Sequence, residues 1–145
     1  MNKMLKKQSP FTTTFGSLIT ILIIGVIILV LFKFQSAPAT KIVLMGDSIT
    51  ESWSSYSPDF FSNNSYLINK GISGETTSQM LDRFDSDVLS LKPEGVIILA
   101  GINDIAQNTG YISVSEIFYN VVFMANLAQK NHINPVLCSV LPANK

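Results

Sequence analysis

The sequence has little of what most metal and cofactor sites require. Its 145 residues include one cysteine, Cys138, and one histidine, His132. A single cysteine excludes an internal disulfide, and no cluster of His, Cys and carboxylate residues has the spacing of a metal site. We therefore expect no metal and no cofactor. Cys138 lies in the apolar run 135–141 and is predicted to be a packed core residue.

Basic charge is also scarce outside the first 34 residues. Residues 1–34 contain four lysines and no acidic residue, whereas residues 35–145 contain six basic and ten acidic residues, a net charge of −4. Because phosphate binding needs a basic patch, this composition argues against a nucleic-acid partner. No G-x-G-x-x-G is complete and no G-K-[ST] is present, which argues against a nucleotide-binding Rossmann domain.

The chain has one long hydrophobic run, residues 15–32, which contains no charge. A helix of that length spans about 27 Å, close to the ~30 Å of a membrane core. Three lysines precede the run and only Lys33 follows it. The positive-inside rule therefore predicts a cytoplasmic tail at residues 1–14, a transmembrane signal anchor at 15–34, and an extracytoplasmic remainder that starts with a Pro/Ala linker at 35–40.

The segment after the run leaves a second interpretation open. Ala37-Pro38-Ala39 is an A-x-A pattern, and cleavage after Ala39 would release a secreted protein. The run is longer than the ~7–15 apolar residues of a typical signal peptide, and Lys33 interrupts the approach to the site. The uncleaved anchor is therefore favoured, with the membrane as a partner through the N-terminal helix.

Residues 41–145 alternate apolar runs with amphipathic stretches. Strands are predicted at residues 41–45, 66–69, 95–100 and 135–141, and helices at 77–91 and 113–131. The second helix opens with the capping-box pattern Ser113-x-x-Glu116, and the first places Asp82, Arg83, Asp85 and Asp87 on its polar side. Continuous apolar strands separated by helices indicate parallel crossovers. We therefore predict an α/β fold, a three-layer α/β/α sandwich with a parallel sheet.

Polar residues follow the first three strands, where such sheets place their sites. Ser48 comes in the run Gly46-Asp47-Ser48, and is either a nucleophile or a helix cap through Ser48-x-x-Glu51. Gly74 is either a turn glycine or a bare N–H near a substrate oxygen. Asn103 either closes an Asx-turn or donates to an oxyanion.

Three ordered segments resemble the first sequence blocks of the GDSL/SGNH hydrolases: GDSIT at 46–50, NKGISGETT at 69–77 and AGIND at 100–104. That family includes thioesterases, lysophospholipases and carbohydrate acetylesterases. The resemblance implies a flavodoxin-like SGNH hydrolase fold over residues 41–145. It also implies a serine ester hydrolase, an acyl or acetyl esterase or lipase, whose small-molecule ester substrate is an acylated lipid or an acetylated carbohydrate.

The resemblance also implies roles for single residues. Ser48 would be the nucleophile, and the oxyanion hole would consist of the Ser48 and Gly74 backbone N–H groups and the Asn103 amide. Asp47 and Asp104 would support these groups by hydrogen bonding. Four aromatic residues after Ser48 either line a pocket for an acyl or sugar group or pack the helix: Trp53, Tyr56, Phe60 and Phe61.

The sequence departs from the family pattern at the general base. The family base is a His in an Asp-x-x-His block near the C-terminus, and this sequence has no such block. His132 precedes the fourth predicted strand, so it should lie at the opposite edge of the sheet, about 25 Å from Ser48. We expect a C-terminally incomplete domain (a fragment, an incomplete reading frame or a frameshift) with little or no turnover. The alternative is a non-catalytic, membrane-anchored ligand-binding module.

Overall fold

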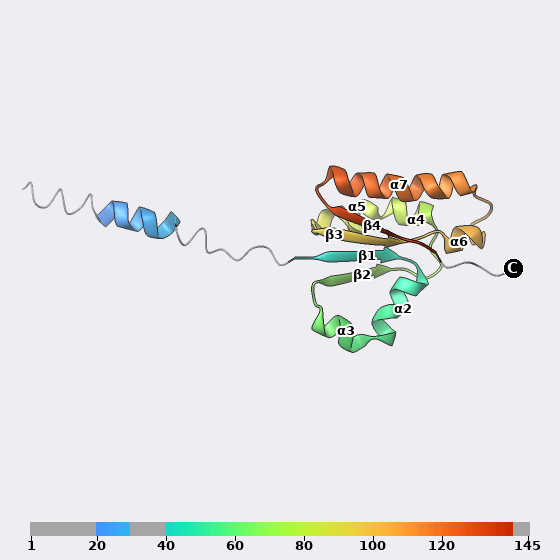
Figure 1. Cartoon of the computed structure of the whole chain (residues 1–145), viewed down its shortest axis with the longest axis horizontal. Helices are drawn as coiled ribbons and strands as arrows, with labels where there is room; N and C mark the ends of the chain where they lie inside the picture. Colours follow the sequence, from blue (N-terminus) through green and yellow to red (C-terminus); the bar gives the residue numbers. More distant parts are fainter. Residues whose placement is uncertain (1–19, 30–39, 141–145) are drawn as a thin grey trace, which may run out of the picture. The chain divides into compact units, whose positions relative to one another are not determined.

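The computed structural model describes residues 20–29 and 40–140, and the chain divides into two compact units, Met1–Pro38 and Ala39–Lys145. In the first unit, residues 20–29 are helical and exposed (Figure 1). Within the described ranges, no helix has the length and hydrophobicity needed to cross a membrane. The predicted tail at 1–14, half of the predicted membrane helix at 15–34 and residues 35–39 of the predicted linker lie outside those ranges.

The second unit is built on a four-stranded parallel sheet with the order β2-β1-β3-β4. Gly46 pairs with Gly71 and with Leu99, and Leu99 pairs with Cys138, so the carboxyl ends of all four strands meet at one edge. This confirms the predicted parallel sheet. The strands are β1 (Ile42–Gly46), β2 (Leu67–Gly71), β3 (Gly95–Leu99) and β4 (Asn134–Cys138).

Helices lie on both faces of the sheet, which confirms the three-layer α/β architecture (Figure 1). One face is covered by α4 (Thr77–Asp82), α5 (Phe84–Asp87), the 3₁₀ turn η1 (Leu89–Leu91) and α7 (Val114–Lys130), and the other by α2 (Ser48–Tyr56) and α3 (Pro58–Asn63). The short α6 (Ile102–Ile105) follows β3. The predicted capping box of α7 forms, with Glu116 N–H donating to Ser113 Oγ at 3.2 Å.

The core lies between the sheet and the layer of α4, α5 and α7. The helix predicted at 77–91 is broken there into α4, α5 and η1, with Arg83 at φ −101° and ψ 3° at the first break. In a regular helix, residues spaced by four are rotated about 40° from one another around the axis, so a long series of them turns away from the core. The breaks let Met80, Phe84 and Val88 all remain fully buried. Their core neighbours are Val43, Met45, Val96, Ile98, Met124, Ala128 and Ile133.

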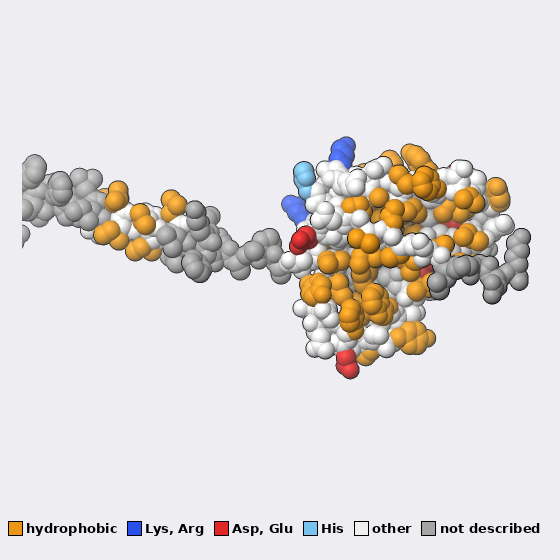
Figure 2. Space-filling view, viewed as in Figure 1, with side chains coloured by type: hydrophobic (Ala, Val, Ile, Leu, Met, Phe, Trp, Pro, Cys, Tyr) orange, Lys and Arg blue, Asp and Glu red, His pale blue; other side chains and the backbone are white. Residues whose placement is uncertain are grey.

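The opposite face of the sheet is less completely covered. The helix α2 packs on β1 and β2, whereas β4 lies at the opposite edge of the sheet from β2, and its Val136 is 54% exposed. Figure 2 shows hydrophobic side chains exposed on the side of the domain where α2 and α3 lie. Cys138 is exposed on β4, so the prediction that it packs in the core is wrong. The apolar run 135–141 indicated burial but could not reveal that its strand lies at the edge.

Candidate active site at the carboxyl ends of the strands

Ser48 is the first residue of α2, and the residue before it caps the helix. The Asp47 side chain is fully buried, and its Oδ1 accepts a hydrogen bond from the Ile49 N–H at 2.9 Å. The capping interpretation of Ser48 is therefore wrong, because Asp47 fills that role. Among the described residues, neither the hydroxyl nor the N–H of Ser48 has a hydrogen-bond partner. Both groups are available at the amino end of a helix, where an anion is stabilised.

The start of α2 lies against the carboxyl end of β2 because of a close backbone approach. A Cβ on Gly71 would lie 2.1 Å from the Glu51 nitrogen, so only glycine fits there. The Asn69 amide donates to the Thr50 carbonyl at 2.6 Å, and the Ile72 N–H donates to the Gly46 carbonyl at 3.0 Å. These contacts bring the loop between β2 and α4 beside the turn that carries Ser48.

Gly74 lies in that loop with φ +80°, a left-handed conformation that favours glycine. A Cβ at this position would meet no atom within 4 Å, so the residue is exposed and sterically open. No described residue accepts a hydrogen bond from the Gly74 N–H. The geometry therefore leaves a second backbone donor free at this edge of the sheet.

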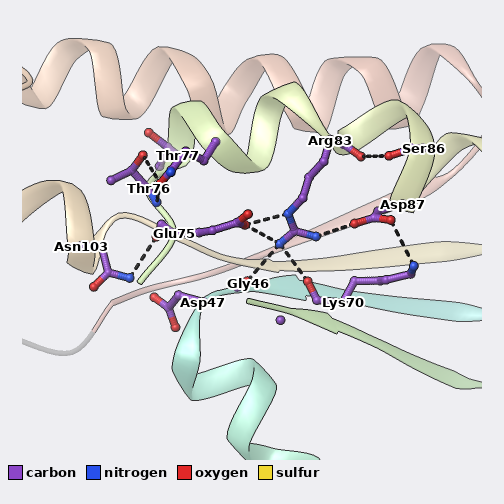
Figure 3. Close-up of polar contacts among 12 residues, drawn as sticks. Gly46, Asp47, Lys70, Glu75, Thr76, Thr77, Arg83, Ser86, Asp87 and Asn103 are labelled. Atoms are coloured by element: carbon purple, nitrogen blue, oxygen red, sulfur yellow. Dashed lines mark hydrogen bonds and ion pairs between the residues drawn. The ribbon is translucent and has the colours of Figure 1, made fainter. Parts of the chain in front are cut away.

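The Asn103 side chain projects from α6 toward the same loop (Figure 3). Its Nδ2 donates to the Glu75 carbonyl at 2.9 Å, and its Oδ1 accepts from Asn108 Nδ2 at 3.0 Å. Asn108 Nδ2 also lies 3.4 Å from the Gly74 carbonyl. The two bonds of Asn103 fix the orientation of its amide and leave one Nδ2 hydrogen free. No sequence pattern indicated Asn108, since its position depends on a turn after α6.

Asp104, the next residue, ties α6 to α4. It is 1% exposed, and its carboxylate accepts from the Thr77 N–H at 2.9 Å and from Thr77 Oγ1 at 2.6 Å. Asn120 Nδ2 on α7 donates to the same Thr77 hydroxyl at 3.1 Å. Three helices thus meet at one buried polar cluster beneath the loops.

A charged cluster centred on Arg83 lies next to these loops (Figure 3). Arg83 Nε is 2.6 Å from Glu75 Oε2, Arg83 Nη1 is 2.7 Å from Asp87 Oδ2, and Lys70 Nζ is 3.0 Å from Asp87 Oδ1. Burial alone would raise the pKa of Asp87, but the hydrogen bonds and charges of Arg83 and Lys70 outweigh it and hold that pKa below 3.8. The sequence predicted that Arg83 and Asp87 lie on the polar side of a helix, and their i, i+4 spacing was a signal for pairing.

A cavity of about 630 Å³ opens beside Ser48, between α2 and the less covered face of the sheet. Its walls are mainly apolar, and they include Trp53, Leu99 and the exposed Cys138. Trp53 also stacks on Phe60, with ring centroids 5.3 Å apart, and meets Phe61 edge-on. Trp53 and Tyr56 therefore line a cavity, and Trp53 also packs with Phe60 and Phe61 in the α2–α3 layer.

His132 is far from this cavity. It is exposed just before β4, with φ 61°, whereas Ser48 follows the carboxyl end of β1. Because the strands are parallel and in register, the two residues lie at opposite edges of the sheet, separated by at least a five-residue strand, or roughly 16 Å. In the described ranges, no group of three His, Cys, Asp or Glu residues is arranged to hold a metal ion.

The sequence model of the GDSL-like Lipase/Acylhydrolase family matches residues 44–142, which include all of these loops. The chain belongs to this family. Among solved structures, it is similar to a GDSL-like lipase from Bacteroides thetaiotaomicron, with 48% identity and a TM-score of 0.69 over 72% of this chain and 50% of that one.

Two curated relatives of this GDSL-like chain match over shorter stretches. The lipoprotein YqeF of Bacillus subtilis is 33% identical over 79 residues, 52% of this chain and 32% of its own length. An acetylxylan esterase of Geobacillus stearothermophilus is 46% identical over 39 residues, 27% of this chain and 18% of its own length. The chain thus spans half the length of the solved relative and less than half of each curated one.

Proposed function

We propose that this chain supplies the nucleophile and the oxyanion hole of a serine ester hydrolase, with Ser48 as the nucleophile. One observation carries the proposal. Asp47 caps α2, so the Ser48 hydroxyl and N–H are both free at the helix terminus that opens on the cavity. The free Gly74 N–H comes from the adjacent loop after β2, and the fixed Asn103 amide comes from α6. The membership of the chain in the GDSL-like family supports the same assignment.

In this mechanism, Ser48 Oγ attacks the ester carbonyl carbon and forms a tetrahedral intermediate. The Ser48 N–H, the Gly74 N–H and the Asn103 amide stabilise its oxyanion, and one such donor contributes roughly 2.7–4 kcal/mol. The intermediate expels the alcohol and leaves an acyl-enzyme, which water hydrolyses to the acid. Asp47 and Asp104 act indirectly, through the start of α2 and the position of α6.

The proton of Ser48 needs an acceptor, because a serine hydroxyl is a weak nucleophile without a base. His132, the histidine of this sequence, lies at the opposite edge of the sheet. We therefore infer that the 145-residue chain alone turns over little or no ester. The proposal assigns it a nucleophile and an oxyanion hole that require a base from outside these residues.

The proposed substrates are esters of small acyl groups, on acetylated carbohydrates or acylated lipids. The apolar cavity beside Ser48 and the similarity to an acetylxylan esterase support this class. We further propose an extracytoplasmic domain held at the membrane by residues 15–34, with cleavage after Ala39 as the secreted alternative. The hydrophobic run and the similarity to a lipoprotein support this placement.

The test supplies the base as free imidazole and follows acetylation of Ser48 by p-nitrophenyl acetate. Without imidazole, we expect the chain and Ser48→Ala to hydrolyse the ester at equal background rates. With imidazole, we expect mass spectrometry to find the acetyl group on Ser48, and a Ser48-dependent rate above background. Ser54→Ala is the matched control, because Ser54 lies in the same helix and its hydroxyl already donates to the Glu51 carbonyl.

The measurements without and with imidazole test the missing base and the nucleophile separately. Robust Ser48-dependent turnover without imidazole would refute the inference that the chain lacks a base. Equal rates for the chain and Ser48→Ala at every imidazole concentration would refute Ser48 as the nucleophile. That second result would favour the alternative of a ligand-binding module that retains the cavity without the chemistry.

A further inference from the structure

We propose that Arg83 is a positioning residue, which holds the Gly74 loop in place relative to Ser48. The catalytic consequence of this proposal rests on the proposed function, whereas its structural part can be tested without any turnover. Arg83 lies outside the three GDSL-like segments, and its guanidinium has no hydrogen bond to the side chain of Ser48 or Asn103. Its guanidinium instead joins the backbone segments that carry the proposed donors.

The guanidinium group of Arg83 joins three segments at the carboxyl edge of the sheet (Figure 3). Its Nη2 lies 3.3 Å from the carbonyl oxygen of Gly46, two residues before Ser48, and 2.9 Å from that of Lys70 in β2. Its Nε lies 2.6 Å from the carboxylate of Glu75, the residue after Gly74. One rigid planar group thus connects the ends of β1 and β2 to the loop that carries Gly74.

Glu75 is held at two points, and both concern the proposed oxyanion hole. Its side chain pairs with Arg83, and its carbonyl accepts the Asn103 amide at 2.9 Å. Glu75 therefore connects Arg83 to two of the proposed donors, the neighbouring Gly74 N–H and the Asn103 amide. Glu75 and Arg83 side chains are 13% and 14% exposed, so water does little to screen their interaction.

The charges of the cluster balance, which lets it exist in a partly buried position. Arg83 and Lys70 contribute two positive charges, and Glu75 and Asp87 contribute two negative ones. Asp87 forms a branch of the cluster that points away from the Gly74 loop, since its partners are Arg83 four residues earlier and Lys70. Glu75→Gln and Asp87→Asn therefore each remove the negative charge of one Arg83 partner, and we expect only the first to affect the loop.

The experiment compares Arg83→Lys, Glu75→Gln and Asp87→Asn in the 145-residue chain. We expect ¹H–¹⁵N NMR to show large shifts of the Gly74 amide and the Asn103 side-chain amide in Arg83→Lys and Glu75→Gln, and small shifts in Asp87→Asn. Lysine keeps the charge but cannot reach both carbonyls and Glu75 with one planar fork. Dispersed spectra in all three variants show that each is folded.

A rate measurement tests the catalytic consequence with the imidazole-promoted acetylation of Ser48. A misplacement of about 1 Å can cost ~10²-fold, so we expect a tenfold to hundredfold loss in Arg83→Lys and Glu75→Gln, and about twofold or less in Asp87→Asn. The dependence on imidazole concentration should not change, because the base does not contact Arg83. A merely stabilising cluster would affect Glu75→Gln and Asp87→Asn alike.

The outcomes separate this proposal from the proposed function. Unmoved Gly74 and Asn103 signals in folded Arg83→Lys and Glu75→Gln would overturn the positioning role, and so would equal rate losses in Glu75→Gln and Asp87→Asn. If Ser48 is not acetylated even in the unaltered chain, the proposed function fails and the NMR shifts alone decide the role of Arg83. Shifts confined to Arg83→Lys and Glu75→Gln would support it.

Discussion

The contact between Asp104 and Thr77 offers a demanding test of how the site is supported. Two hydrogen bonds converge on one carboxylate across 27 residues of sequence, from the Thr77 N–H at 2.9 Å and from its hydroxyl at 2.6 Å. Both residues are essentially inaccessible to water, at 1% and 0% exposure. The perturbation is Asp104→Ala, which removes the acceptor and leaves two buried donors.

The expected loss follows from those two bonds. A hydrogen bond to a charged group contributes about 1.5–3 kcal/mol, so the pair contributes roughly 3–6 kcal/mol. Water cannot readily replace the carboxylate, because the site is closed on the sides of α4, α6 and α7. Domains of this size unfold at roughly 5–15 kcal/mol, so Asp104→Ala should be close to the limit of folding. Its effect should therefore be among the largest of any substitution at this edge of the sheet.

The assay is urea unfolding followed by circular dichroism, with the free energy of unfolding extrapolated to water. Thr77→Val is the matched control, because it removes the hydroxyl and keeps the N–H bond to Asp104. We expect it to lose less than Asp104→Ala, since one charged bond of ~1.5–3 kcal/mol remains, and part of its loss comes from the bond that the Asn120 amide donates to the Thr77 hydroxyl. A loss below about 1 kcal/mol in Asp104→Ala would refute the reasoning, because it would mean that the two bonds are not formed or are replaced at no cost.

Two further predictions concern the charged cluster and the loop glycines. The pKa of Asp87 in the folded state is lowered from 3.8, so the cluster stabilises the fold above about pH 4, and this contribution is lost as pH falls through the lowered value. In urea unfolding from about pH 6 down to pH 3, Asp87→Asn should lose less stability than the unaltered chain, and parallel curves would contradict the pairing. Gly71→Ala should destabilise the fold more than Gly74→Ala. A Cβ on Gly71 would lie 2.1 Å from the Glu51 nitrogen. A Cβ on Gly74 would meet no atom, so only the positive φ of that residue destabilises the variant, by ~1–2 kcal/mol. Equal losses in thermal unfolding would indicate that β2 and α2 are not in close contact.

Much of the fold could be predicted because its signals are local. Segment 41–45 is apolar after Lys41 and segment 95–100 is apolar throughout, and both form strands of the parallel sheet within a residue of the expected positions. The pattern Ser113-x-x-Glu116 predicted the start of α7, since a capping box needs only residues one turn apart. Parallel strands then bring their carboxyl ends to one edge, so the loops that follow them could be expected to meet.

The features that were missed depend on contacts between distant segments. Helical periodicity at 77–91 separated apolar from polar side chains, and it predicted that Arg83 lies on the polar side with Asp82, Asp85 and Asp87. Arg83 instead donates to the carbonyl oxygens of Gly46 and Lys70, 37 and 13 residues away. Backbone carbonyls are present at every residue, so no pattern of side chains indicates which of them will receive a buried guanidinium. The exposure of Cys138 was missed for a similar reason, because its burial depends on the place of β4 in the sheet order.

The start of α2 shows that a shift of the helix cap by one residue decides whether the Ser48 hydroxyl is bound to the backbone or free. Asp47 and Ser48 are both favourable helix caps, and the sequence offers Ser48-x-x-Glu51 as a complete capping box. If Ser48 were the cap, its hydroxyl would accept a hydrogen bond from a backbone N–H of the first turn, and Asp47 would lie in the loop before the helix. In the structure the helix begins one residue earlier, and Asp47 Oδ1 accepts from the Ile49 N–H. The Asp47 carboxylate thus caps the helix, and the Ser48 hydroxyl next to it has no hydrogen-bond partner among the described residues.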